Sequence, residues 1–408
     1  MYGLGITELV SWGVLIYSFP VLALPMHAQL GWSYAQLDAA YAVGVVVSGL
    51  AGIPVGRWLQ RHGPRALMTG GSVLTAMVLL AWSQVRSLPA LFAVFVAAGL
   101  AMSATLYEPA LATAAVWFVV RRPHAVLVVT VLAGLSSVVF VPLTSALIVS
   151  LGWRHTVLVL GAIAALVGIP THALLLRRDP AALGLRPDGV PEAGSRTEPP
   201  PPGREPGYVP TPVLRRSSFR WLTSCLTLAT MAKSVVVIGL VAYLNDRGYP
   251  LATAALAAGG IGLTQVLGRA LVVALRGRWP EARIASAAFG AQAGAAALLL
   301  ATPGHDAAAT VAVGTFVVVF GIGCGLVELL RGTILPAYYG AHEYPRVNGV
   351  LSAFVVSARA AGPALVSAVL AATGTFAPVL AGVAAMTLGS GGSLIRAEQA
   401  HRQEPGPH

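Results

Sequence analysis

Seven ionisable side chains lie inside stretches of sequence that are otherwise apolar: Glu8, Glu108, Lys233, Arg269, Glu328, Arg331 and Arg359. Charged groups are costly to keep in an apolar environment, so they face a polar interior and mark pathways for substrates or ions. A buried carboxyl can take up and release a proton near neutral pH, and a guanidinium or ammonium group can bind an anion. These seven residues are therefore our candidates for binding a substrate or a proton.

The spacing of the seven residues predicts their depth. Four lie 11 to 13 residues from the residue that marks the predicted cytoplasmic edge of their stretch, roughly 16 to 20 Å along a helix. They are Glu108, Lys233, Glu328 and Arg359, counted from Arg121, Arg220, Tyr339 and Arg346. Glu8 and Arg269 are shallower, at roughly 10 Å, and could instead form a structural pair or lie at an interface. Arg331 follows Glu328 by three residues and could simply neutralise it along one helix.

Lys233 is the only lysine in the chain, and it lies in the apolar run TLATMAKSVVVIGLVAY, residues 227–243. The other cations are arginines, so codon usage alone can explain why lysine is rare. From this depth, however, the side chain cannot reach water along lipid. We expect Lys233 to face a cavity or a carboxylate partner, with Glu8, Glu108 and Glu328 as the candidates.

Twelve apolar stretches hold these residues, and each is long enough to cross a ~30 Å hydrocarbon layer as a helix. The chain is 56% hydrophobic and only 10% charged, which is typical of an integral membrane protein. The stretches cover residues 3–26, 36–56, 66–84, 89–118, 124–149, 155–176, 219–243, 252–275, 283–302, 307–338, 347–371 and 376–395. We expect the first to be a span and not a signal peptide, because it is too long and no basic segment precedes it. The sequence predicts an all-α integral membrane protein with twelve transmembrane helices.

The arginines are distributed unevenly between the loops. The even-numbered loops and the C-terminal segment carry 19, whereas the odd-numbered loops carry three, Arg86, Arg154 and Arg247. Because positively charged loops stay on the cytoplasmic side, we expect a multi-pass protein of the plasma (inner) membrane with both termini cytoplasmic. The net charge of +11 follows largely from this bias and does not indicate a nucleic-acid partner. The basic loops could contact anionic lipid headgroups.

One long hydrophilic segment divides the spans into two sets of six. Residues 177–216 read RRDPAALGLRPDGVPEAGSRTEPPPPGREPGYVPTPVLRR, and the prolines favour an extended linker. Offsets of 217 to 221 residues align Gly31 with Gly248, Arg61 with Arg278, Glu108 with Glu328 and Pro142 with Pro363. Such matches indicate a parallel internal repeat. The predicted units are an N-terminal half (1–178), a linker (179–216), a C-terminal half (217–398) and a cytoplasmic tail (399–408).

The loop after the second span, GRWLQRHGPR (56–65), resembles the signature of the major facilitator superfamily of secondary transporters. Gly56, Arg61, Gly63 and Arg65 match it, whereas Gln60 stands where the family usually has an aspartate. In the second copy, GRALVVALRGRWPEAR (268–283), Gly277 replaces that aspartate. A tight basic turn would explain the first copy of the motif. It would not explain why a second copy occurs at the equivalent place in the C-terminal half.

The resemblance covers essentially the whole chain and implies a fold and an activity. In this family, helices 1, 4, 7 and 10 line a central cavity, helices 2, 5, 8 and 11 complete it, and the remaining four face outward. All seven candidate residues fall in the first two groups of helices. The loop motif implies a gating contact, and the missing aspartate leaves the latch of the outward-open state in doubt. The fifth span, GLSSVVFVPLTSALIVSLGWR, and the segment RRDPAALGLRP look most like the monocarboxylate-transporter-like branch.

The predicted function is secondary active transport by alternating access, coupled to protons. The midplane cations favour an organic anion with a carboxylate as substrate, and Glu108 and Glu328 are the candidate proton carriers. The run AKS at 232–234 lacks the glycines of a nucleotide-binding loop. We expect no cofactor and no metal, because Cys225 and Cys324 lie in apolar spans and the aspartates are scattered. We expect a monomer.

Alternatives stay open at this point. An exporter of amphipathic or cationic drugs on the same fold would use Glu8 and the other acidic residues to recognise a cation. A membrane sensor that does not transport would share the fold as well. An enzyme is disfavoured, because no aspartate lies in the interior of a span to form a paired catalytic motif.

Overall fold

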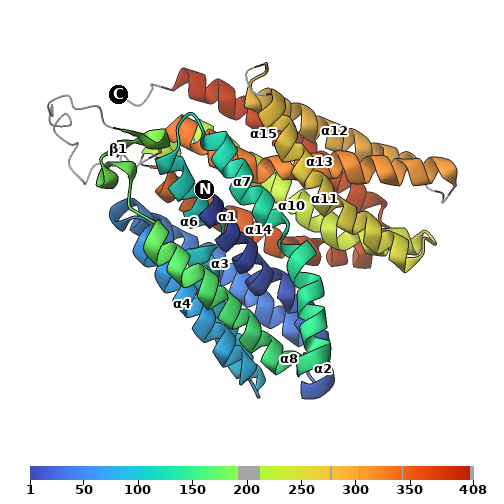
Figure 1. Cartoon of the computed structure of the whole chain (residues 1–408). Helices are drawn as coiled ribbons and strands as arrows, with labels where there is room; N and C mark the ends of the chain where they lie inside the picture. The colour runs from blue at the N-terminus through green and yellow to red at the C-terminus, as the bar shows by residue number, and fades with distance from the viewer. Residues whose placement is uncertain (192–211, 276–277, 303, 305, 342, 405–408) are drawn as a thin grey trace.

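The computed structural model describes residues 1–191, 212–275, 278–302, 304, 306–341 and 343–404, and these are largely helical (Figure 1). The N-terminal half begins with α1 (Tyr2–Trp12), a π-helical turn (Gly13–Tyr17) and α2 (Ser18–Leu30), which together form span 1. Spans 2 and 3 are α3 (Tyr34–His62) and α4 (Pro64–Ser83), and span 4 joins α5 (Leu88–Thr105) to α6 (Tyr107–Trp117). Spans 5 and 6 come from α7 (Arg122–Gly134), α8 (Ser136–Pro170) and a second π-helical turn (Thr171–Leu175).

The C-terminal half follows a short helix, α9 (Pro212–Arg215). Spans 7 to 9 are α10 (Ser217–Asp246), α11 (Leu251–Leu275) and α12 (Glu281–Ala301). Spans 10 to 12 are α13 (Ala307–Tyr339), α14 (Tyr344–Thr373) and α15 (Ala377–Gln403). The last helix therefore continues into the segment that we expected to be a tail from residue 399.

The twelve predicted spans are confirmed. Within the described ranges, nine helical stretches are long and apolar enough to cross a membrane, and the bent helix α10 is a tenth. The stretch Arg122–Leu175 contains two spans, because Gly152 adopts φ +74 and interrupts α8, and α11 is the twelfth. Helix ends follow local capping chemistry. For example, Ser33 and Gln36 form a capping box that starts α3, and Gly63 ends it with φ +77.

The two halves pack against each other along two seams on one side of the molecule. α3 packs along α14, while α7 contacts α11 and α13. In the first seam, a Cβ atom on Gly56 would lie 2.2 Å from the carbonyl oxygen of Pro345, so only glycine permits this approach. Both residues lie near the ends of their helices on the side that carries the linker and the C-terminus. From there the halves diverge (Figure 1).

The apolar cores follow the same division. One cluster combines residues of both halves, such as Leu111 and Val126 with Leu330 and Leu351. A second cluster contains only residues of the N-terminal half, and a third only residues of the C-terminal half. The halves thus share a core near the seams and keep separate cores away from them.

Several spans are broken near the middle, where the candidate charges lie. The π-helical turn follows Trp12 in span 1, and Leu106, with φ −89 and ψ −162, separates α5 from α6. α10 bends by 42° between Val237 and Gly239, a few residues after Lys233. Broken helices at this depth are common in transporter binding sites.

The first part of the predicted linker folds instead of remaining extended. Two short strands, β1 (Leu185–Arg186) and β2 (Val190–Pro191), pair antiparallel around a turn that contains Asp188. Asp188 accepts hydrogen bonds from the backbone N–H groups of residues 119–121, which docks this hairpin on the loop before α7. Residues 192–211 of the predicted linker, and Gly277 of the second loop motif, lie outside the described residues.

Candidate functional site

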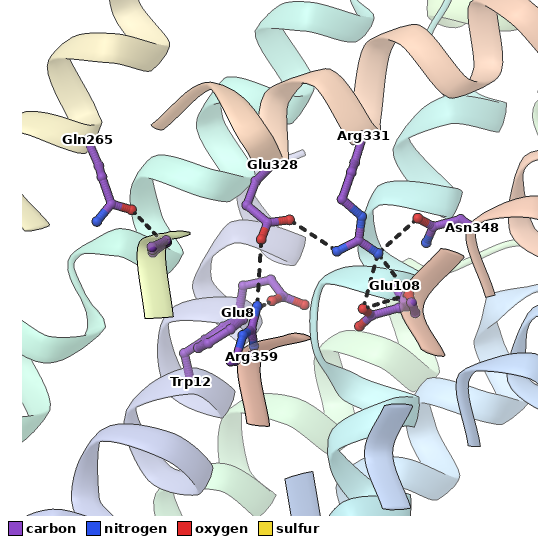
Figure 2. A network of polar contacts seen from close by, with 10 residues as sticks. Glu8, Trp12, Glu108, Gln265, Glu328, Arg331, Asn348 and Arg359 are labelled. Carbon is purple, nitrogen blue, oxygen red and sulfur yellow. Dashed lines mark hydrogen bonds and ion pairs between the residues drawn. The ribbon is translucent and has the colours of Figure 1, made fainter. Parts of the chain in front are cut away.

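Arg331 is the centre of a polar network between the two halves (Figure 2). Arg331 lies on α13, and the residue is 1% exposed. Nη1 is 3.3 Å from Glu328 Oε2, one turn earlier on the same helix, and Nη2 is 3.3 Å from Glu108 Oε1 on α6. One arginine therefore pairs with two carboxylates, one from each half.

Two polar side chains of α14 complete the contacts of Arg331. Its Nη2 donates to Asn348 Oδ1 at 2.9 Å and to Ser352 Oγ at 2.8 Å. Ser352 in turn donates to Glu108 Oε1 at 3.0 Å. Asn348 and Ser352 are four residues apart and so lie on one face of the helix. Glu108 lies in the first turn of α6, where the break at Leu106 starts a new helix whose N-terminus favours a negative charge.

Arg359 on α14 is the accessible cation of the network. Its Nη2 is 3.9 Å from Glu328 Oε1, and 38% of its side chain is exposed although it lies deep in its span. The guanidinium carbon is 5.9 Å from the centre of the Trp12 ring on α1, within the range of a cation–π contact. Arg359 thus lies between the halves, is loosely paired, and can be reached from solvent.

Lys233 lies close to this cation but has a neutral partner. Its Nζ donates to Gln265 Oε1 on α11 at 3.0 Å. The next residue, Ser234, donates to the backbone carbonyl of Arg359 at 2.7 Å, which places Lys233 and Arg359 at one level of neighbouring helices. Among the described contacts, an amide therefore takes the place of the carboxylate partner that we expected for Lys233.

Glu8 and Arg269 are both buried, and they do not pair with each other in the described contacts. Glu8 Oε2 accepts a hydrogen bond of 3.0 Å from Trp12 Nε1, whereas its Oε1 has no partner. Arg269 on α11 donates from Nη1 to the backbone carbonyl of Thr130 on α7, across the second seam. Neither residue lies at an exposed interface, as their exposed fractions are 0% and 3%.

The structure places all seven candidate residues on the expected helices and connects several of them directly. Glu108, Glu328, Arg331 and Arg359 form one ion-pair network, and Lys233 adjoins it. Four further polar or aromatic residues take part that we did not predict: Trp12, Gln265, Asn348 and Ser352. A search for uncharged polar residues inside the spans would have found Gln265, Asn348 and Ser352. Nothing in the sequence marks Trp12.

The loop motif lies apart from this network, at the end of α3. Gln60 Nε2 donates to Glu343 Oε1 at 2.9 Å, so the residue in the place of the family's aspartate forms a hydrogen bond between the halves. Gly63 adopts φ +77, and Arg178 packs directly against it. The arginines of the motif, Arg61 and Arg65, are exposed.

Within the described ranges, no group of three His, Cys, Asp or Glu side chains could hold a metal ion. Cys225 and Cys324 are buried free thiols.

Comparison with known proteins gives consistent matches. A family model described as Major Facilitator Superfamily matches residues 4–363. Monocarboxylate transporter 13 of Bos taurus is 29% identical over 261 residues, covering 62% of this chain and 56% of that protein. The oxalate:formate antiporter of Oxalobacter formigenes is 31% identical over 159 residues, covering 37% of each chain. The chain thus spans little more than half the length of the first relative and much less of the second.

Solved structures agree in fold. The Major Facilitator Superfamily transporter FucP, solved in the outward conformation, superposes with a TM-score of 0.69 and covers 98% of both chains. The two sequences are 16% identical, so the likeness concerns the fold alone. Twelve spans, two halves and the seams between them are shared features of this architecture.

Proposed function

The chain belongs to the Major Facilitator Superfamily, and on that premise we propose that it is a secondary active transporter of a small organic anion, coupled to protons. Membership of this transporter family also confirms that the chain is not an enzyme. It is a multi-pass membrane protein. The single observation that carries the proposal is the exposure of Arg359. This cation lies at mid-depth, its side chain is 38% exposed, and it is only loosely paired with Glu328.

The chemistry of the accessible cations supports a carboxylate-bearing substrate. Arg331 has its charge balanced by Glu108 and Glu328, whereas Lys233 has a neutral partner and Arg359 a distant one. An anion that enters between the halves would meet two cations on neighbouring helices. A guanidinium binds a carboxylate with two parallel hydrogen bonds, and an ammonium group adds a point charge. The two similar proteins are named for monocarboxylate transport and for oxalate:formate exchange, which supports the same substrate class.

Coupling to protons is supported by the carboxylates of the same region. Glu8, Glu108 and Glu328 are all at least largely buried, and protonation of such a group is a simple means of linking a proton to substrate movement. The separate cores of the two halves support alternating access, because each half can move as a unit about the shared seams. We further propose that the protein acts as a monomer in the plasma (inner) membrane, with both termini in the cytoplasm and basic loops near lipid headgroups.

Transport in proteoliposomes tests this function. We expect uptake of radiolabelled lactate, formate or oxalate that rises with an imposed inward proton gradient. Arg359→Ala should reduce that uptake at least tenfold, because one charged hydrogen bond contributes about 1.5–3 kcal/mol. Arg86→Ala, which removes an exposed loop cation, is the matched control and should transport like the wild type.

The outcomes separate the proposal from its rivals. Uptake of lipophilic cations, with no uptake of any of the three anions, would indicate the drug-exporter alternative. Absence of any flux, together with tight binding of a solute to purified protein, would indicate a sensor.

A further inference from the structure

Glu8 has an environment unlike that of the other two carboxylates. It is fully buried on α1, and its one hydrogen bond among the described residues comes from the indole N–H of Trp12. Its second oxygen, Oε1, has no hydrogen-bond partner within the part of the chain that the structure describes. A buried carboxylate without a cation is far more costly than a buried neutral carboxyl group, so the geometry favours the protonated form.

The neighbouring negative charges also favour the protonated form of Glu8. Glu8 lies within electrostatic range of Glu108 and Glu328, and these two carboxylates share Arg331, whose single positive charge offsets only one of their two negative charges. The elements that pack on α1 carry the following titratable groups: Tyr17, Tyr107, Glu108, Arg122, His124, Arg154, His155 and His172. None of them is recorded as a hydrogen-bond or ion-pair partner of Glu8 in the described part of the chain.

Trp12 connects Glu8 with the accessible cation. Its N–H points to Glu8 Oε2, and its ring lies 5.9 Å from the guanidinium carbon of Arg359 (Figure 2). If Glu8 loses its proton to water, a negative charge forms at one edge of the indole. Arg359 would then be drawn toward Trp12 and away from a bound anion. Anion binding and protonation of Glu8 thus favour each other, and linkage makes the effect reciprocal.

Resting on the proposed transport of an organic anion, we propose that Glu8 carries the coupled proton and that Trp12 transmits its protonation state to Arg359. Glu108 and Glu328, the carriers expected from the sequence, instead hold Arg331 in place. The proton leaves the Glu8 carboxyl for water on one side of the membrane and returns from water on the other. Trp12 is a positioning residue in this scheme, because it changes neither charge nor covalent structure.

Binding of lactate and oxalate to purified protein, measured by calorimetry across pH, tests the proposal. In the wild type the affinity should fall about tenfold per pH unit above a midpoint, as expected for one linked proton. Glu8→Gln mimics the protonated carboxyl and should keep the high affinity at every pH. Trp12→Phe keeps the ring but loses the donor that stabilises the charged form, so the midpoint should move up by about one pH unit. The controls Glu398→Gln and Trp58→Phe should behave like the wild type.

A Glu8→Gln protein with the wild-type pH dependence would overturn the role of Glu8, and an unchanged midpoint in Trp12→Phe would overturn that of Trp12. Infrared spectroscopy adds a readout that needs no substrate. We expect a carbonyl band from a protonated carboxyl group that is lost in Glu8→Gln and kept in Glu398→Gln. If no anion binds but this band is present, the proposed substrate class is wrong and the protonation of Glu8 still stands; if the band is absent, the inference fails.

Discussion

At the scale of single residues, the network separates Arg331, which pairs with two carboxylates, from Arg359 and Lys233, which are weakly paired in the described contacts. Arg331 has four polar partners and is almost fully buried. Arg359 is partly exposed, and the one hydrogen bond of the Lys233 ammonium group within the described residues goes to Gln265. This difference predicts different roles for side chains of the same charge. Arg331 should be needed for the structure of the site, and Lys233 and Arg359 for binding.

Replacement of Lys233 tests the binding role. Lys233→Ala should fold and insert normally but lower anion affinity roughly 10- to 100-fold, the equivalent of one charged hydrogen bond. Lys233→Arg should restore part of the affinity, because the planar guanidinium keeps the charge but not the shape. Calorimetric titration with oxalate measures both. Normal affinity in a well-folded alanine variant would reduce Lys233 to a structural residue.

Replacement of Arg331 tests the structural role. Arg331→Met removes the cation that pairs with both Glu108 and Glu328 and leaves Arg359, 3.9 Å from Glu328, as the remaining cation in their described ion pairs. We expect this change to cost about 3–5 kcal/mol of stability. Arg331→Lys should cost less, because it retains the charge but not the several donors of the guanidinium. The melting temperature in detergent reports the change. A methionine variant as stable as the wild type would contradict the central role of Arg331.

At the scale of elements, glycines decide how closely the two halves approach. A valine at Gly56 would bring its Cβ into the carbonyl oxygen of Pro345, a backbone atom that cannot give way easily. Gly56→Val should therefore oppose closure of the first seam. We expect a several-fold lower cross-linking yield, with a bifunctional thiol reagent, between cysteines introduced at Gln60 and Glu343, whose side chains are in hydrogen-bond contact in this conformation. Gly70→Val, on a face with nothing within 4 Å, is the control and should leave the yield unchanged.

The hairpin around Asp188 is the second element with a specific prediction. Burial raises the pKa of Asp188, but three hydrogen bonds from the backbone N–H groups of Arg121, Val120 and Val119 outweigh this effect and hold it below its usual value. A lowered pKa in the folded state means that docking is stabilised above the usual aspartate value of about 3.9 and weakens as pH falls below it. The protection factors of the three amides, which are the hydrogen-exchange rates of an unstructured chain divided by the observed rates at the same pH, should fall in that acidic range. Asp188→Ala should lower them at neutral pH too, and unchanged protection in that variant would contradict docking through Asp188.

At the scale of the whole molecule, the two halves diverge toward one side of the membrane. Whether that side is the outside or the cytoplasm depends on how the protein is oriented. The shared core lies on the side of the termini, so cytoplasmic termini would make this an outward-open conformation. Single cysteines at Ala182, in the short 3-10 turn Pro180–Leu183 just before the hairpin, and at Ser87 in the loop before α5 test the orientation, since both sites are exposed. An impermeant thiol reagent should label Ala182→Cys only from the cytoplasmic side and Ser87→Cys only from outside. The native cysteines are buried and should give little background; the reverse labelling pattern would invert the proposed topology.

The twelve spans and the placement of seven charged residues inside them could be predicted from the sequence. Both depend on information that is local in the chain: the length of an apolar run, the loops that interrupt it, and the position of a charge within it. For this reason the predicted boundary between spans 5 and 6, residues 150–154, contains Gly152, the residue that interrupts α8. Internal repetition and the loop motif of Gly56, Arg61, Gly63 and Arg65 indicated the family, which the comparison confirms.

Only the tertiary structure decided which charges are paired. Arg331 and Glu108 are 223 residues apart, and their contact depends on the rotation of two helices and on the closure of the seams between the halves. Lys233 meets Gln265 instead of a carboxylate for the same reason, and Glu8 is left with an indole donor. Depth in a span follows from counting residues, but the partner of a side chain depends on which faces of distant helices are packed together, and sequence spacing does not encode that.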